Sequence, residues 1–169
     1  MSFTVRRLGD ADIAAFRAVR LEGLTLEPTA FASSLAEDAA IADAEWQARL
    51  ARHSTFGVFE GAELVGTATF TVEAGAKTAH RGHLVGVYLR PGARGTGAAQ
   101  LLLEAVLDAA RHKVRFLYLI VNDANHRAKR FYERFGFTVF GQDPGGLLVD
   151  GTLYQDCLMM LRLTEGSGK

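Results

Sequence analysis

The sequence predicts an α/β (α+β) fold, with a mixed, mostly antiparallel sheet of about seven strands flanked by four helices in the order βααβββαβαββ. Three observations predict it. Short apolar runs of strand length are bounded by turn residues. Longer stretches repeat apolar residues every three to four positions, and one strand–helix–strand crossover lies in the second half. The 169 residues are 49% hydrophobic, which fits a single domain at 1–163 followed by a flexible tail at 164–169.

The N-terminal quarter predicts one strand and two helices. Residues 2–7 alternate apolar and polar side chains, as a half-buried strand does. Asp10 offers an N-cap for the helix that follows, and the segment "EPTAF" at 27–31 ends that helix. A second helix is expected over about 43–52, where apolar side chains recur at i and i+4. These helices would form one layer against the sheet.

The boundaries of the remaining elements are easier to place, because glycine lies at most of the expected turns. They are a hairpin from Thr55 that turns at Gly61, a strand within 80–90, a helix over about 96–112, a strand within 115–122, a helix within 123–137 that ends at Gly136, and a long hairpin that turns at Asp150 and Gly151. Gly86 lies inside the strand at 80–90, where an isolated glycine predicts a bulge.

Composition excludes several classes of function. Lysine plus arginine and aspartate plus glutamate both number 19, so net charge favours neither a nucleic-acid groove nor an anionic membrane surface. The start lacks a signal-peptide pattern and no apolar run reaches about eighteen residues, which predicts a cytoplasmic protein. Cys157 is the only cysteine, so no disulfide framework is expected. We predict no metal site, because strand alternation sends His80 and His83 to opposite faces.

A glycine-rich loop precedes the helix expected at 96–112. The first amides of a helix carry partial positive charge, and glycine lets a phosphate approach the backbone closely. A Walker-type loop is excluded because no Gly-Lys-Ser or Gly-Lys-Thr occurs, and a dinucleotide fingerprint lacks its third glycine, which Gln100 replaces. The pattern that remains is RxxGxA, from Arg94 to Ala99. A tight strand-to-helix connection is the alternative reading of the loop alone.

Here the sequence resembles the GNAT N-acetyltransferase superfamily, whose acetyl-coenzyme A loop has the form [RQ]xxGx[GA] after the fourth strand. The segment "LYLIVNDANHRAKRFYERFGF" is similar to that family's second motif, with Asn125, Tyr132 and the pair Gly136-Phe137 at the matching positions. The order of elements matches along nearly the whole chain. The resemblance therefore implies an acetyl-coenzyme A cosubstrate.

The resemblance also implies which residues bind the cosubstrate. They are Val87, Tyr88 and Leu89 on the fourth strand, Arg94, Gly95, Thr96, Gly97, Ala98 and Ala99 in the loop, and Asn125, Ala128, Lys129 and Tyr132 on the following helix. Helical periodicity places the last four on one face, with the arginines of that helix roughly opposite. Asparagine is also a preferred N-cap residue, so Asn125 is a candidate cap of this helix as well.

Acetyl transfer needs a proton for the leaving thiolate, and Tyr132 suits that role. A phenol has an ordinary pKa near ~10 against ~8.5 for a thiol, so it keeps its proton at neutral pH. The alternative is a tyrosine that only packs in the core. Several relatives carry a glutamate on the fourth strand where this chain has Val85, so His83 is the nearest candidate base, and water is the alternative.

The predicted function is N-acetyltransfer from acetyl-coenzyme A to a primary amine, of a small molecule or a peptide, by direct attack in a ternary complex. The loop "PTAF" followed by "LAED" resembles the substrate side of several family members, which makes Glu22, Glu27 and Phe31 candidates for acceptor binding, with Glu37 as a further carboxylate. The alternative is a catalytically weak module that binds acyl-coenzyme A as a sensor. Dimerisation is a family-level expectation, for which the apolar last strand is the candidate surface.

Overall fold

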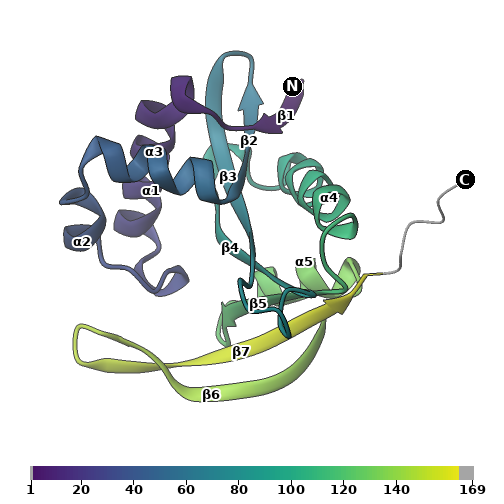
Figure 1. The fold of residues 1–169 in the computed structure, drawn as a ribbon. Helices are drawn as coiled ribbons and strands as arrows, with labels where there is room; N and C mark the ends of the chain where they lie inside the picture. Colours follow the sequence, from purple (N-terminus) through teal and green to yellow (C-terminus); the bar gives the residue numbers. More distant parts are fainter. Residues whose placement is uncertain (1, 164–169) are drawn as a thin grey trace, which may run out of the picture.

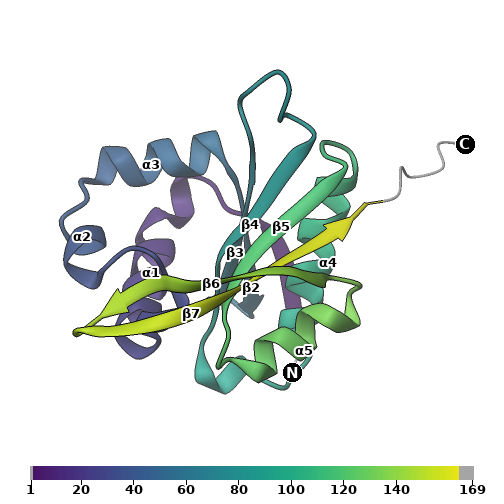
Figure 2. The same ribbon diagram turned by 90° about the horizontal axis from the view of Figure 1, so that it is seen from below.

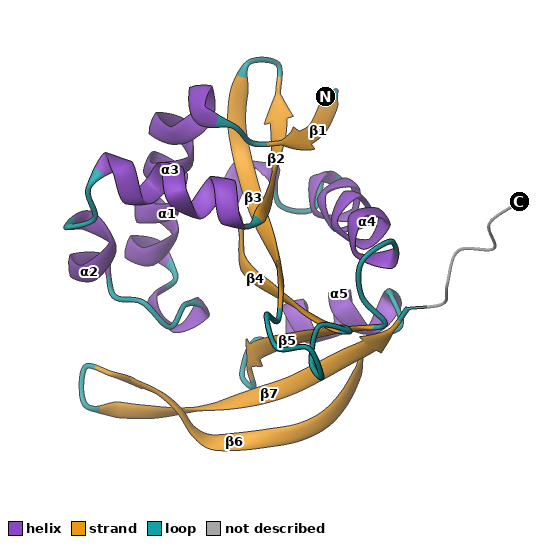
Figure 3. Ribbon diagram, viewed as in Figure 1, coloured by secondary structure: helices purple, strands orange, loops and turns teal. Residues whose placement is uncertain are grey.

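The computed structural model describes residues 2–163, and the tail predicted at 164–169 lies outside the described residues. One sheet of seven strands runs through the molecule in the order β1-β2-β3-β4-β5-β7-β6 (Figures 1 and 3). Its strands are β1 (Phe3–Arg7), β2 (Ser54–Glu60), β3 (Glu63–Val72), β4 (Arg81–Leu89), β5 (Phe116–Asn122), β6 (Thr138–Val149) and β7 (Thr152–Arg162). Only β4 and β5 pair in parallel, so the predicted mostly antiparallel sheet is confirmed.

The α-helices among the described residues are α1 (Ile13–Leu26), α2 (Leu35–Ala39), α3 (Asp43–Arg52), α4 (Ala98–Arg111) and α5 (His126–Arg134). The sequence predicted four, and α2 is the addition. It forms because Ser34 and Glu37 cap it reciprocally: the Glu37 amide donates to Ser34 Oγ at 3.2 Å, and the Ser34 amide donates to Glu37 Oε2 at 2.7 Å. A capping box can thus nucleate one short helix in a segment without apolar periodicity.

The helices cover the sheet in two groups (Figures 1 and 2). The first group, α1 to α3, buries Trp46 completely, and the edge of the Phe16 ring packs on it with centroids 5.4 Å apart. The second group, α4 and α5, packs on the other face, where Leu102, Val106 and Leu117 are among the most buried side chains. The ends of β4 and β5 lie between the two groups of helices, so residues of both groups could contact a ligand bound there.

The strands β4 and β5 pair only at one end. Their parallel register joins residues 81–83 to residues 116–118 and then stops. In the antiparallel register with β3, Thr67 lies opposite Tyr88 but Thr69 lies opposite Val85, so β4 holds one extra residue. Gly86 has a φ of 61° there, which confirms the bulge predicted at this glycine.

Three predicted turns are confirmed as well. Gly61 has a φ of 59° in the β2–β3 turn, and Gly136 has a φ of 92° just after α5. Asp150 and Gly151 both take positive φ, of 49° and 78°, between β6 and β7, as a two-residue hairpin turn of the primed kind requires. Within residues 2–163, none of the helices combines the length and the apolarity that a membrane crossing needs.

Candidate active site

A cleft of about 910 Å³ opens where β4 and β5 separate. The loop before α4, one side of α5, the ends of β4 and β5, and the segment after α1 all contribute to its walls. From the predicted cosubstrate residues, the lining includes Val87, Tyr88, Leu89, Arg94, Gly95, Gly97, Ala99, Asn125, Ala128 and Tyr132. The structure therefore brings most of the predicted residues to one cavity.

The loop before α4 presents backbone rather than side chains to the cleft. Gly97 is the N-cap, with a φ of 92° and no side-chain cap, and Gly95 has a φ of 78°. Gly97 thus supplies no capping side chain, and the Ala98 amide has a long contact of 3.5 Å to Thr96 Oγ1. Thr96 and Ala98 are not in the cleft lining: Thr96 Oγ1 donates to the Ala93 carbonyl at 2.6 Å, and Ala98 is fully buried. These two residues hold the loop whose glycines face the cleft.

Arg94 lines the cleft, but its guanidinium group is hydrogen-bonded to other residues of the protein. Its Nε donates to the Leu89 carbonyl at 3.0 Å, and its Nη1 donates to Glu27 Oε1 at 3.0 Å. Glu27 also lines the cleft. This ion pair ties the segment after α1 to the end of β4, and both partners are within reach of a bound ligand.

Tyr88 links the cleft to α1. Its hydroxyl donates to Glu22 Oε1 at 2.9 Å, while Arg90 Nε donates to Glu22 Oε2 at 3.0 Å. Burial, and then the hydrogen bond to Glu22, raise the pKa of Tyr88 to about 12. Glu22 itself is not in the cleft lining, so the structure gives it the role of orienting Tyr88.

Two side chains of the second motif have defined positions on α5. Asn125 caps the helix, because its Oδ1 accepts from the Ala128 amide at 3.1 Å, and the residue also borders the cleft. Tyr132 is buried, with Phe131 and Phe137 packed edge-on against its ring at 5.4 and 5.7 Å between centroids. Burial raises the pKa of Tyr132, so its hydroxyl stays protonated throughout the neutral range.

The family model described as "Acetyltransferase (GNAT) family" matches residues 21–137. The chain belongs to this family. A 5-NmdU N-acetyltransferase from Pseudomonas phage PaMx11 is 44% identical over 54 residues, which are 32% of this chain and 37% of that protein. The match thus spans little more than a third of the curated relative.

Solved structures extend the likeness over the whole GNAT fold. A phosphinothricin acetyltransferase from Sinorhizobium meliloti, solved in complex with AcCoA, superposes with a TM-score of 0.84 at 19% identity, covering 99% of this chain and 91% of that one. The ribosomal-protein-S18-alanine N-acetyltransferase of Escherichia coli gives a TM-score of 0.74 at 18% identity, covering 98% and 97%. At these identities the likeness shows the fold.

The side of α5 that faces the cleft in this GNAT chain includes three of the four predicted residues, Asn125, Ala128 and Tyr132. Lys129 is outside the cleft lining, because its Nζ pairs with Asp123 Oδ1 at 2.7 Å. Phe131 and Phe135 line the cleft in addition, together with three arginines of the helix. Sequence periodicity identifies the faces of a helix, but contacts such as that of Tyr132 with Phe137 determine which face turns inward.

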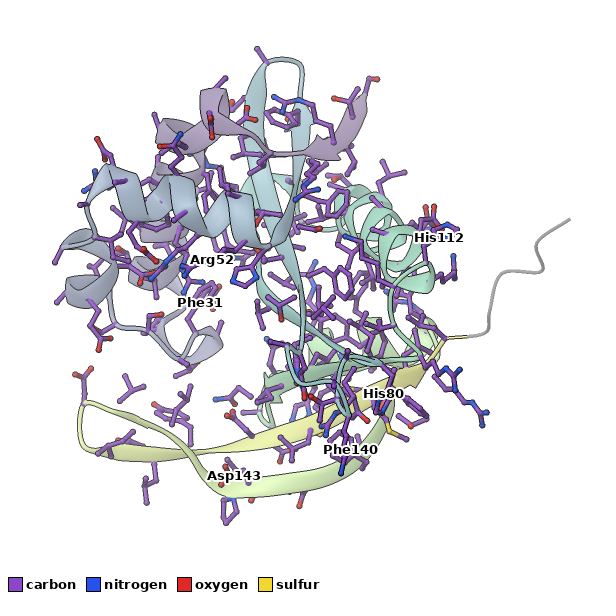
Figure 4. The ribbon with its side chains drawn as sticks, viewed as in Figure 1. Phe31, Arg52, His80, His112, Phe140 and Asp143 are labelled. Carbon is purple, nitrogen blue, oxygen red and sulfur yellow. The ribbon has the colours of Figure 1, made fainter. Side chains whose placement is uncertain are left out.

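His83, the predicted base, lies outside the cleft lining. Its Nε2 is 2.8 Å from Glu73 Oε1, and Arg81 lies 3.3 Å from the same carboxylate. The hydrogen bond from His83 lowers the pKa of Glu73. The physical reason for the displacement is that His83 belongs to the part of β4 still paired with β5, whereas Val85, two residues on, borders the cleft. Figure 4 shows His80, near that paired end, well apart from Phe31.

The predicted acceptor side is only partly at the cleft. Glu27 lines it, with Thr29 and Ala30 beside it. Phe31 is buried behind them against Tyr88, with ring centroids 6.4 Å apart, and lies within the N-terminal helical layer (Figure 4). Glu37 is outside the cleft lining and caps α2.

The contribution of β5 and β7 to this cleft was not predicted from the sequence. Asn122, at the end of β5, and Tyr154, on β7, both line it. Asn122 Oδ1 accepts from the Ala124 amide at 3.0 Å, while its Nδ2 is buried without a partner among residues 2–163. The asparagine itself, directly after an apolar run, was a usable signal. Tyr154 had none, because the pairing of β7 with β5 and β6, which joins distant segments, places it there.

Proposed function

We propose that the protein is an N-acetyltransferase that moves the acetyl group of acetyl-coenzyme A to a primary amine by direct attack in a ternary complex. The observation that carries the proposal is the opening between β4 and β5, which runs from the amide-rich start of α4 to the buried Tyr132. Family membership supports the reaction class, and the neighbour solved in complex with AcCoA supports the cosubstrate.

In this proposal the pyrophosphate of the cosubstrate lies on the loop before α4. The amides from Gly95 to Ala99 donate to its oxygens, and the positive end of the helix favours its charge. The pantetheine arm then occupies the gap beside Val87 and Leu89, where β5 no longer pairs with β4. Free backbone groups of β4 are suited to pair with its amides as a further strand would.

The chemistry assigns one step to Tyr132. The lone pair of a neutral amine attacks the thioester carbonyl, a C–N bond forms, and the C–S bond breaks. The phenol donates its proton to the departing sulfur. The nitrogen releases a proton as the amide forms, and this proton restores the phenol, so the products are an amide and the free thiol. A raised pKa suits this role because the group is protonated at every turnover.

The proton of the attacking nitrogen leaves through water in this account. Val85 supplies no carboxylate at the cleft, and His83 is held by Glu73 outside it. Glu27 is the carboxylate that lines the cleft, and it is paired with Arg94. We assign to Glu27 the recognition of a cationic acceptor, since a protonated amine can share its free oxygen.

The test is release of free thiol from acetyl-coenzyme A in the presence of a panel of amines, compared between the natural protein and Tyr132→Phe. We expect amine-dependent release that falls by ~10² or more in the variant, the usual scale for a positioned acid. Calorimetry should show nearly unchanged binding of coenzyme A to that variant. Equal turnover by both proteins would sink the assignment of Tyr132.

The same experiment distinguishes an acetyltransferase from the alternative function. The missing carboxylate at Val85 favours a module that binds acyl-coenzyme A without transferring the acyl group. Tight binding of coenzyme A with no thiol release across the panel would support that module. Competition by adenine dinucleotides as effective as that of coenzyme A would contradict both readings.

A further inference from the structure

Three arginines of α5 lie along the cleft beside the glycine loop. Arg127, Arg130 and Arg134 all line the cleft and are exposed. They follow one another at i, i+3 and i+7, so they form a row on one side of the helix that rises over about 10 Å. The opposite side of the helix carries Lys129, which is paired and faces away.

The charge of this row is not neutralised within the part of the chain that the structure describes. For residues 2–163, no carboxylate forms an ion pair with any of the three guanidinium groups, whereas Arg94 and Lys129 each have one. The acidic residue in the cleft lining, Glu27, is already bound to Arg94. The row therefore leaves about three uncompensated positive charges at one end of the cleft.

The row begins next to the glycine loop and ends at Arg134, beside the aromatic ring of Phe131. A Cβ built on Gly95 would lie 3.9 Å from Arg127 Nη2, so Arg127 is at contact distance from the loop. The guanidinium of Arg134 lies 5.6 Å from the centre of the Phe131 ring, and both residues line the cleft. Arg130 and Arg134 lie further along the row than Arg127, so an anion that they held would be next to a pyrophosphate on the α4 amides.

We propose that Arg127, Arg130 and Arg134 form a second anion subsite, which takes the 3′-phosphate on the ribose of coenzyme A. The inference rests on the proposed cosubstrate. Coenzyme A carries three phosphates, and the loop before α4 accounts for the two of the pyrophosphate. Guanidinium groups match the oxygens of a phosphate monoester in geometry and in charge. The row thus makes the protein selective for coenzyme A over its 3′-dephospho form.

The test is calorimetric titration with coenzyme A and with 3′-dephospho-coenzyme A, using the natural protein and the double variant Arg130→Gln, Arg134→Gln. We expect the natural protein to bind coenzyme A roughly tenfold or more tightly than the dephospho form, the scale of one or two charge-assisted hydrogen bonds. The double variant should lose this preference while binding the dephospho form as before. Arg162→Gln, an exposed arginine of β7 outside the cleft, is the control and should keep the preference.

Three results would overturn the subsite. The first is equal binding of the two ligands by the natural protein, and the second is a preference that persists in the double variant. A double variant that loses affinity for both ligands equally would show a general electrostatic effect and would also contradict it. If the natural protein bound neither ligand, both the proposed function and the subsite would be contradicted. If it bound coenzyme A but released no thiol, only the proposed function would be contradicted, and the ratio of the affinities for coenzyme A and its 3′-dephospho form would still test the subsite.

Discussion

The two ends of the β4–β5 pair differ in where their backbone groups find partners. Residues 81–83 of β4 pair with residues 116–118 of β5, and His83 there is held by Glu73. Beyond Val85 the pairing has ended, β4 carries a bulge at Gly86, and the strand borders a cleft. Loss of strand pairing, with one extra residue in β4, thus distinguishes the open end, which borders the cleft, from the paired end, which forms the scaffold.

The largest effect on binding is expected at the open end, from Gly97→Val. The φ of 92° at Gly97 strains any side chain, and a branched one would stand where a phosphate must approach. Affinity for coenzyme A should fall about 50-fold, or ~2–3 kcal/mol, as hydrogen bonds to a charged ligand are lost. Calorimetry with Gly92→Val as control checks it, because a Cβ at Gly92 meets nothing within 4 Å and its φ is not positive. Equal affinity of the two variants would refute the phosphate cradle.

The next effect is expected at the paired end, from Gly82→Ala. A Cβ there would lie 2.4 Å from the buried Phe70 ring and 3.0 Å from the Thr71 carbonyl. Overpacking of this kind should lower the free energy of unfolding by about 2 kcal/mol. Urea titration measures it, and the KM for acetyl-coenzyme A should stay unchanged at temperatures where the variant is folded. A large rise in KM without loss of stability would contradict the division between the two ends.

A smaller effect on stability is expected at the bulge itself. Alanine at Gly86 would meet Arg20 Nη1 only at 3.6 Å, so its cost comes from the left-handed backbone, about 1 kcal/mol. Asparagine tolerates this conformation better than alanine. Gly86→Asn should therefore unfold at a higher urea concentration than Gly86→Ala. The reverse order would mean that contacts, and not φ, limit this position.

The smallest effect is expected from His83→Gln. Because His83 lies outside the cleft lining and contacts Glu73, kcat/KM should change by less than about twofold, or ~0.4 kcal/mol. The pH dependence of kcat/KM should keep its shape. A tenfold fall that also removed a titration from that profile would restore His83 as the base.

Much of this architecture was predictable because local signals agree with the tertiary structure. The turns at Gly61 and at Asp150-Gly151 take the positive φ that their residue types predict. Gly86 likewise marks its bulge. The helix α2 was missed because its signal is the capping pair Ser34 and Glu37, and apolar periodicity is absent from so short a segment.

The site was predictable in its parts but not in its boundaries. Alternation puts His83 and Val85 on one face of β4, but it carries no information on where pairing with β5 stops. Periodicity similarly separates Lys129 from the arginines of α5 but leaves the rotation of the helix to tertiary packing. Tyr154 reaches the cleft only through long-range strand register. Such features depend on contacts between distant segments, which no local pattern encodes.

The most direct test of the account is backbone hydrogen exchange with and without acetyl-coenzyme A, followed by peptide segment. We expect new protection at residues 85–89 of β4 and at residues 95–100 around the start of α4. We expect no change at residues 81–83, whose backbone partners are already in place. Protection that appeared at the paired end instead, or at neither end at saturating acetyl-coenzyme A, would contradict the claim that the open half of β4 is the binding site.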